Sequence, residues 1–354
     1  MQYSISFCTV CMNRAMHLKE TLLQNIIDNL DYHPVEFVLL DYGSRDDMYD
    51  WARQTLQSYV NKGLLRYYRN PEPQFFHMSH AKNMALRLAS NEIVCSVDAD
   101  NFTGRGFAAY INERFSRESD IFLSPPRIGI DKKWWDVQGR ICLRKDDFYT
   151  LRGYDEGVVE YGYEDQDFKN RLEVFGRRKV VIKDPAFLQA LQHDDSLRIA
   201  EGCSTKKMKE LFISIADDTS EIIYLQNNNS YERFYTDNDL LIQEGNRPMK
   251  ISLRNMYTGI YAGDGRSLQL YKRNNEPLMI LSIQSDGSLR SKDQREFYPI
   301  TSRQLCESFL MQRAIYLGRK VYISNRNRAT AVNGVGFGTG TVWRNFSDER
   351  IILD

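Results

Sequence analysis

The stretch Ile93-Val94-Cys95-Ser96-Val97-Asp98-Ala99-Asp100 is a short apolar strand that ends in two carboxylates. A buried strand end of this kind is costly unless its acids hold water or a cation. Hard oxygen ligands suit Mg²⁺ or Mn²⁺. A second acidic cluster, Glu164-Asp165-Gln166-Asp167, follows the turn-like Glu160-Tyr161-Gly162-Tyr163 and begins a helix-like segment. The two acidic clusters are therefore the first candidates for catalytic or metal-binding residues.

The segments around the first cluster alternate between strand-like and helix-like patterns, which predicts an α/β fold with a mostly parallel sheet. One apolar face repeats at helical spacing through Leu18, Leu22 and Ile26. The expected strands are 3–11, 35–40, 64–68 and 93–97, and the expected helices are 15–30, 48–60 and 79–88. A further helix is expected over 165–175, ending at Gly176.

The character of the chain changes near Asp217, where short β-like runs separated by turn residues begin. We therefore expect two domains, 1–216 and 217–354. A four-residue echo recurs at 252–255, 288–291 and 324–327, a period compatible with a β-trefoil-like arrangement. One helix-like stretch, 302–316, fits that arrangement poorly. The β-rich domain is expected to bind the growing glycan, to pair subunits or to dock a partner enzyme, and the glycan-binding expectation is a fold-level analogy.

Composition excludes several classes of protein. The 354 residues carry 47 basic and 47 acidic side chains, so a strongly electrostatic partner such as nucleic acid is not expected. Cys8 and Cys11 have C-x-x-C spacing without a second cysteine pair, which favours buried thiols over a zinc or redox site. No signal peptide or membrane-spanning run is visible. A cytoplasmic protein is expected, and peripheral membrane association or a homodimer stays open.

Four segments, in order, resemble the GT-A fold glycosyltransferases of family 2. They are Ser6-Phe7-Cys8-Thr9-Val10-Cys11-Met12-Asn13-Arg14, the acidic residue and Gly-Ser in 37–47, the segment 80–85, and Gly162-Tyr163-Glu164-Asp165-Gln166-Asp167. The last is similar to the acceptor motif of β-galactosyltransferases and chondroitin-polymerase-type enzymes. Tyr163 stands where those often have glycine, which loosens inference about the acceptor sugar.

The resemblance implies a donor site for a UDP-sugar. Asp100 is implied to bind Mn²⁺ (or Mg²⁺), and His193 is implied to complete the metal site. Asp98 is implied to touch the ribose or a metal-bound water, and it is also a candidate metal ligand. Turn formation and a solvated helix face are the alternatives for Asp41 and Lys82. The expected nucleotide-binding residues are Thr9, Asn13, Arg14, Asp41, Ser44, Lys82, Asn83 and Asp98.

The resemblance assigns Asp165 as the general base of an inverting transfer and Glu164 as a residue that holds the acceptor. A base must lie within hydrogen-bond reach of the attacking hydroxyl. An acid-rich helix N-terminus, favoured by the helix dipole alone, is the alternative for these carboxylates. Aromatic rings can stack on the apolar faces of sugars. The candidates for that platform are Trp134, Trp135, Tyr161 and Tyr163.

The sequence therefore predicts a metal-dependent inverting glycosyltransferase that moves a hexose or N-acetylhexosamine from a UDP-sugar to a glycan or lipid-linked sugar. Bacterial polysaccharide biosynthesis is the expected pathway. A non-catalytic glycan-binding or scaffold protein remains the alternative. Nucleotidyl transfer is disfavoured because the loop Cys11-Met12-Asn13-Arg14 lacks glycine, and the glycine-rich 333–340 is not followed by the Lys-Ser/Thr of a phosphate loop.

Overall fold

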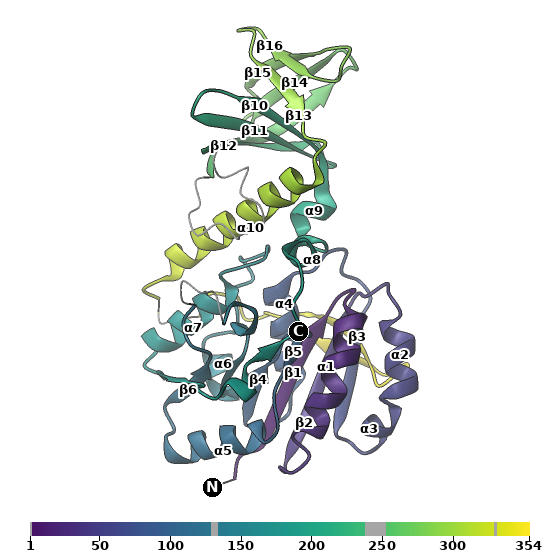
Figure 1. Cartoon of the computed structure of the whole chain (residues 1–354), viewed down its shortest axis with the longest axis vertical. Coiled ribbons are helices and arrows are strands. Elements are labelled where there is room, and N and C mark those ends of the chain that lie inside the picture. Colours follow the sequence, from purple (N-terminus) through teal and green to yellow (C-terminus); the bar gives the residue numbers. More distant parts are fainter. Residues whose placement is uncertain (1, 129–133, 238–252, 329–330) are drawn as a thin grey trace. The chain divides into compact units, whose positions relative to one another are not determined.

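The computed structural model describes residues 2–128, 134–237, 253–328 and 331–354. The chain forms two compact units (Figure 1). The sheet unit comprises Met1–His193 and Gly318–Asp354, and the barrel unit comprises Asp194–Leu317. The structure thus divides the chain differently from the expected boundary at 217, because the C-terminal residues belong to the first unit.

A nine-stranded mixed sheet forms the sheet unit, in the order β19-β18-β3-β2-β1-β4-β7-β6-β8. The neighbours β3, β2, β1 and β4 are parallel, as predicted, whereas β7, β18 and β19 pair antiparallel with their neighbours. The strands are β1 (Ile5–Cys11), β2 (Val35–Tyr42), β3 (Leu65–Asn70), β4 (Ile93–Ser96), β6 (Ile121–Ser124), β7 (Ile141–Arg144), β8 (Arg178–Val181), β18 (Gly340–Arg344) and β19 (Arg350–Leu353).

Helices cover both faces of this sheet, because alternate residues of each strand point to opposite sides. Phe7 of β1 packs in the apolar cluster with α1 (Ala15–Ile27), α2 (Met48–Thr55) and α5 (Phe107–Arg117). Its neighbour Cys8 packs in the cluster with α4 (Met78–Leu88), α6 (Lys145–Thr150) and α7 (Glu164–Val174). Both Cys8 and Cys11 are buried free thiols, as expected. Smaller elements are α3 (Gln57–Asn61), the 3₁₀ turns η1 (Trp135–Val137) and η2 (Pro185–Phe187), and the paired strands β5 (Asn101–Phe102) and β9 (Gln189–Ala190).

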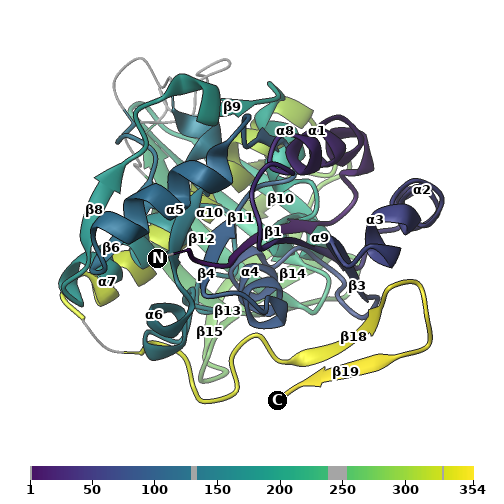
Figure 2. The ribbon, with the colours of Figure 1, turned by 90° about the horizontal axis from the view of Figure 1, so that it is seen from below.

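The C-terminal residues extend the sheet rather than the barrel. Strand β18 pairs antiparallel with β3, and β19 forms the edge (Figure 2). Before it, the segment 333–340 packs against α4, where a Cβ at Gly338 would overlap the backbone of Asn83 and Met84. The glycine-rich stretch 333–340, which lacks the Lys-Ser/Thr of a phosphate loop, therefore packs closely against a helix.

The barrel unit is a closed barrel in which the described strands β10 to β17 pair antiparallel in sequence order and β17 returns to β10. This order does not confirm a trefoil, and the echo at 324–327 lies at the end of a helix. Ser252, the first residue of the echo at 252–255, lies outside the described residues. The elements of this unit are α8 (Asp195–Ile199), α9 (Cys203–Lys207), β10 (Met208–Ile215), β11 (Thr219–Gln226), β12 (Ser230–Asp237), β13 (Arg254–Gly263), β14 (Ser267–Lys272), β15 (Pro277–Ile283), β16 (Leu289–Ser291) and β17 (Glu296–Pro299). The helix α10 (Arg303–Asn325) begins in this unit, and its residues from Gly318 onward are assigned to the sheet unit.

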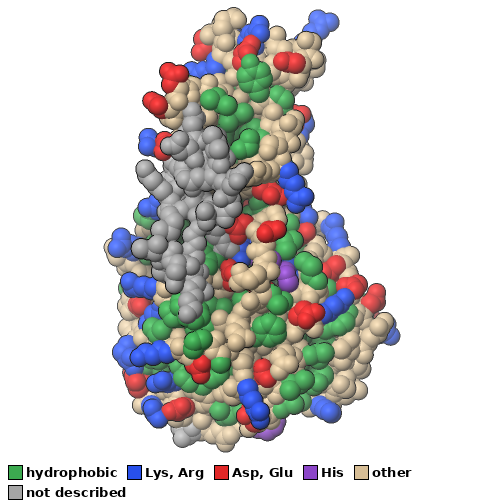
Figure 3. All heavy atoms as spheres, in the orientation of Figure 1, with side chains coloured by type: hydrophobic (Ala, Val, Ile, Leu, Met, Phe, Trp, Pro, Cys, Tyr) green, Lys and Arg blue, Asp and Glu red, His purple; other side chains and the backbone are tan. Residues whose placement is uncertain are grey.

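Surface charge follows the balanced composition. Basic and acidic side chains are interspersed over the face drawn in Figure 3, without a large field of one sign. No helix in the described part of the chain is long and apolar enough to cross a bilayer.

Candidate active site

The candidate residues follow the carboxyl ends of neighbouring parallel strands. Because β1 pairs in parallel with both β2 and β4, the loops after these three strands meet at one edge of the sheet. In open α/β sheets, ligands bind at this edge. Asn13 and Arg14 follow β1, Ser44 follows β2 and Asp98 follows β4. The parallel pairing thus brings residues far apart in sequence to a common edge.

Asp41, the last acid of β2, is fully buried and organises the turn that follows it. Its Oδ1 accepts the Ser44 backbone N–H at 2.8 Å, and its Oδ2 accepts the Tyr67 hydroxyl at 2.8 Å. Burial raises the pKa of Asp41, and these hydrogen bonds oppose the rise. The turn-forming alternative is therefore realised, and a contact between Asp41 and a uracil or ribose stays a prediction.

Asn13 and Ser44 join the two loops at the predicted nucleotide pocket. The backbone N–H of Asn13, which has a φ of 54°, donates to Ser44 Oγ at 3.1 Å. Asn13 Oδ1 in turn accepts the Arg45 backbone N–H at 2.6 Å. Thr9 is buried within β1, two residues before its end. The loops after β1 and β2 therefore form one connected rim.

The predicted metal ligands Asp100 and His193 meet in the structure. His193 Nε2 lies 2.7 Å from Asp100 Oδ2, and Arg14 Nη1 lies 3.5 Å from the same ring nitrogen. The pairing of β5 with β9 delivers residue 193 to this place, and the backbone N–H of Leu191 donates to the Asp100 carbonyl at 2.8 Å. Three residues expected at the donor site are thus brought together.

This pair fits a divalent cation by its chemistry, since a carboxylate and an imidazole together suit Mn²⁺. Among the described residues, no group of three or more His, Cys, Asp or Glu forms a metal-binding cluster. The chain would therefore hold an ion mainly through Asp100 and His193. Catalytic Mg²⁺ is commonly bound by one or two protein carboxylates, with substrate phosphates and water as the other ligands.

Lys82 of α4 lies at the centre of the acidic residues. Its buried ammonium is 2.8 Å from Asp165 Oδ1, 3.6 Å from Asp98 Oδ1 and 3.6 Å from Glu164 Oε1. Burial works to lower the pKa of Lys82, but the Asp165, Asp98 and Glu164 carboxylates outweigh it and hold the pKa well above its usual value. Lys82 thus contacts carboxylates of both clusters, whereas the sequence predicts a contact with the nucleotide.

The two acceptor-motif carboxylates begin α7, and the turn before them is left-handed. Gly162 has a φ of 98° and Tyr163 a φ of 72°. Glu164 is buried, and burial together with the charge of Asp165 raises its pKa to about 7. Burial likewise raises the pKa of Asp98. These acids share one ammonium, so their protonation is interdependent.

Gly139 and Arg140 lie next to the Asp98 loop, although they belong to none of the motifs recognised in the sequence. A Cβ at Gly139 would overlap the Asp98 carboxylate, so only glycine leaves room for it. Arg140 is fully buried and donates from Nη2 to Asn101 Oδ1 at 3.2 Å. Among the described residues, its Nε and Nη1 have no hydrogen-bond acceptor. Both residues directly precede β7, and the pairing of β7 with β4 brings them to Asp98.

The structure does not place Asn83 in the site. It is fully buried on α4, and its amide donates to Tyr154 O and Glu156 Oε1 and accepts from the Tyr154 backbone N–H. A side chain with these partners has no face toward a nucleotide. Asn83 therefore fixes the loop before the acceptor motif.

The four aromatic candidates are half-buried. Gln138 donates to the Trp134 carbonyl at 2.8 Å and accepts from Lys169 of α7 at 3.0 Å. The ring of Tyr163 lies 5.6 Å from that of Tyr322. Gln138 thus links the tryptophan segment to α7, and stacking of any ring on a sugar stays a prediction.

One protein-family model matches part of the chain. Residues 6–169, a little under half of the chain, match the model of glycosyl transferase family 2. This match supports a glycosyltransferase, the enzyme class that the sequence predicts. The matched segment contains both acidic clusters but not His193. No curated protein matches the sequence.

Solved structures show a weaker likeness. The mannosyltransferase PcManGT from Pyrobaculum calidifontis, in complex with GDP-Man and Mn²⁺, has a TM-score of 0.45 and 18% identity, covering 58% of this chain and 63% of that one. S. aureus TarS 1–349 has a TM-score of 0.42 and 19% identity, covering 52% and 58%. Its complex with UDP-GlcNAc has a TM-score of 0.42 and 18% identity, covering 55% and 59%. The chain thus spans less than two thirds of the length of each.

Proposed function

We propose that this chain, with its family 2 domain, is a metal-dependent inverting glycosyltransferase that moves a hexose or N-acetylhexosamine from a UDP-sugar to a hydroxyl of a glycan or lipid-linked sugar. One observation carries the proposal. The Lys82 ammonium lies within 3.6 Å of carboxylate oxygens from both acidic clusters, those of Asp98 in the first and of Glu164 and Asp165 in the second. An acid of the proposed donor side and two acids of the proposed acceptor side therefore contact the same ammonium.

On the donor side, Asp100 and His193 would hold the ion, with Asp98 beside them. A bound Mn²⁺ or Mg²⁺ would supply the positive charge that offsets the leaving diphosphate. Arg14 adds a fixed cation 3.5 Å from His193 Nε2. The rim formed by Asn13 and Ser44 lies beside this group and is suited to the nucleoside.

On the acceptor side, Asp165 serves as the base. Its Oδ1 is occupied by Lys82, and no described residue hydrogen-bonds to its Oδ2, which is the oxygen that would take the acceptor proton. Glu164 has a pKa raised to about 7, so below that pH it carries a proton and can donate a hydrogen bond to a sugar oxygen. This division of roles suits attack on the anomeric carbon from the face opposite the nucleotide.

The first test is calorimetric titration of UDP in the presence of Mn²⁺ and then of EDTA. Metal-dependent binding is expected, and Asp100→Ala should remove it. Asp165→Asn should abolish sugar transfer while leaving UDP affinity unchanged. Full activity in Asp165→Asn would show that another group is the base.

Hydrolysis of the sugar donor distinguishes the proposed enzyme from the alternative, a non-catalytic glycan-binding or scaffold protein. A glycosyltransferase should slowly hydrolyse its UDP-sugar even without an acceptor, because water can replace the attacking hydroxyl. Folded protein that binds glycans but neither binds nor hydrolyses any nucleotide sugar would favour the alternative.

A further inference from the structure

The last two turns of α10, Gly318–Asn325, pack against the beginning of the acceptor helix α7. The sequence assigns this segment to an accessory domain, but it belongs to the sheet unit. Three separate contacts join it to residues at or next to the acceptor motif. Each involves a different residue of α10, and all three lie within the sheet unit.

The first contact is a backbone approach. A Cβ at Gly318 would overlap the carbonyl oxygen of Gly162, so the helix can come this close only because residue 318 is glycine. Gly162 and Tyr163 both have positive φ, a conformation that costs free energy for a residue such as Tyr163 unless its surroundings hold it. The α10 backbone lies against this turn.

The second contact is between rings, since Tyr322 lies 5.6 Å from Tyr163 at an interplanar angle of 33°. Aromatic pairs at such distances contribute about 0.5–1.5 kcal/mol beyond the area they bury. Tyr163 directly precedes Glu164. Its ring orientation is therefore set in part by α10.

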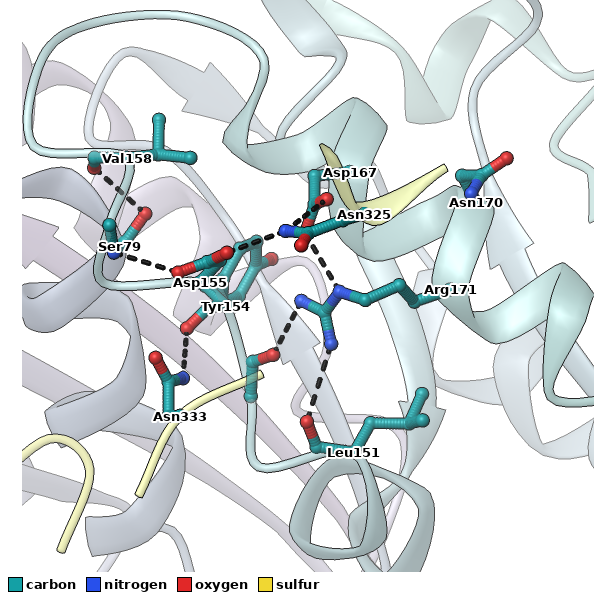
Figure 4. A network of polar contacts seen from close by, with 12 residues as sticks. Ser79, Leu151, Tyr154, Asp155, Val158, Asp167, Asn170, Arg171, Asn325 and Asn333 are labelled. Atoms are coloured by element: carbon teal, nitrogen blue, oxygen red, sulfur yellow. Dashed lines mark hydrogen bonds and ion pairs between the residues drawn. The ribbon is translucent and has the colours of Figure 1, made fainter. Parts of the chain in front are cut away.

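The third contact is a buried polar network (Figure 4). The Asn325 amide donates to Asp167 Oδ1 at 3.0 Å and to Asp155 Oδ2 at 2.5 Å. Arg171 donates to the other oxygen of Asp167 at 2.8 Å and to the carbonyls of Leu151 and Gly153. Asp167 lies in the first turn of α7, between the acceptor carboxylates and Arg171. Asn325 thus joins the end of α10 to that turn and to the loop at Asp155.

We propose that the segment Gly318–Asn325 positions the acceptor carboxylates, with Asn325 as the principal positioning residue. This inference rests on the proposed function of Glu164 and Asp165. Asn325 touches neither of them and acts through Asp167 and the first turn of α7. A displacement of about 1 Å at a reacting group can cost on the order of 100-fold in rate. Loss of the Asn325 donor should therefore reduce transfer more than donor binding.

The test is Asn325→Asp, which keeps the side-chain volume but replaces the shared donor by a third carboxylate beside Asp155 and Asp167. Repulsion should shift the first turn of α7. The matched control is Asn29→Asp, since Asn29 is equally buried in the same unit and donates to Asn25 O and Thr103 Oγ1, distant in sequence from α7. Both variants are measured in the full chain for UDP affinity, donor hydrolysis, transfer to acceptor and hydrogen exchange of the amides of 164–168.

We expect Asn325→Asp to lose about 10- to 100-fold in transfer and in donor hydrolysis, because acceptor and water use the same base, with UDP affinity within about twofold of wild type. Amides of the first turn of α7 should exchange faster. Asn29→Asp should keep the wild-type ratio of turnover to UDP affinity. If Asn325→Asp also kept that ratio, the positioning role would be refuted.

Two further outcomes remain decisive. If Asn325→Asp does not fold, Tyr322→Ala at a half-buried position tests the same segment, and an unchanged ratio there would overturn the inference. If the wild-type protein neither binds UDP nor hydrolyses a nucleotide sugar, the proposed function fails. Hydrogen exchange at 164–168 then still decides whether α10 holds the beginning of α7.

Discussion

Replacing Lys82 by methionine should destabilise the sheet unit strongly. Methionine keeps much of the length of the side chain but removes the only ammonium within 4 Å of Asp98, Glu164 and Asp165 among the described residues. Removing one partner of a buried ion pair typically costs about 3–5 kcal/mol, because the other charge is left uncompensated. For a domain of roughly 150–250 residues this lowers Tm by about 6–20 °C.

The loss should grow with pH. The pKa of Glu164 is about 7 with Lys82 present, and it should rise further when the cation is removed. Between its unfolded pKa of about 4.3 and that raised value, the folded variant binds a proton that the unfolded chain has released. Stability therefore falls as pH rises through this window. The gap between wild type and Lys82→Met should be small near pH 5 and large near pH 8.

The assay is urea unfolding followed by circular dichroism at pH 5 and pH 8. Lys145→Met is the matched control, because Lys145 is half-buried, contacts the Ala89 carbonyl and has no carboxylate within ion-pair distance in the described part of the chain. Its cost should be small and nearly independent of pH. An equal loss at both pH values in Lys82→Met, or no more than in Lys145→Met, would refute the reasoning.

Three further changes test other parts of the site. Gly139→Ala should displace the Asp98 carboxylate and reduce donor hydrolysis at least tenfold, while its Tm stays within a few degrees of wild type. Glu164→Gln is uncharged at every pH. As pH rises from about 4.5 through 7, its free energy of unfolding should increase by about 1–3 kcal/mol relative to wild type, because the raised pKa makes ionised Glu164 destabilising. Urea unfolding at pH 5 and 8.5 measures this difference. A chain ending at 216 lacks β18, β19 and Asn325 and should be insoluble or unfolded by circular dichroism, so a cooperative melt would contradict the division into units.

The first half of the fold follows from local sequence. An apolar run that ends at a turn residue is a strong signal for a buried parallel strand, and each such run, from Tyr3 to Val97, became a strand of the sheet. The same signal places the residues that follow each strand at one edge. The assignment of Asp100 and the acceptor motif to one site came from the family resemblance. His193 lies 2.7 Å from Asp100, and binding of a metal by this pair stays a prediction.

Lys82 shows what residue type cannot reveal. A lysine on a helix beside a nucleotide-binding edge suggests a phosphate ligand, yet its ammonium is held by three carboxylates that tertiary packing brings together. Asn83 differs for a related reason, since its amide has its partners in the loop at Tyr154 and Glu156. Sequence gives the chemistry of a side chain, whereas the choice among partners is made by packing.

Only the glycine-rich segment 333–340 gave a local sign that the C-terminal residues join the sheet. The glycines of 333–340 permit close backbone approach, but the partner, the backbone at Asn83, lies far away in the chain. Gly318 and Asn325 give still less, because they lie beyond the helix-like stretch expected over 302–316, in the part of α10 that the sequence does not predict. Their role becomes visible only against Gly162 and Asp167. An acceptor motif that begins with two left-handed residues needs support from outside its own segment, and in this chain the support comes from residues more than a hundred positions away.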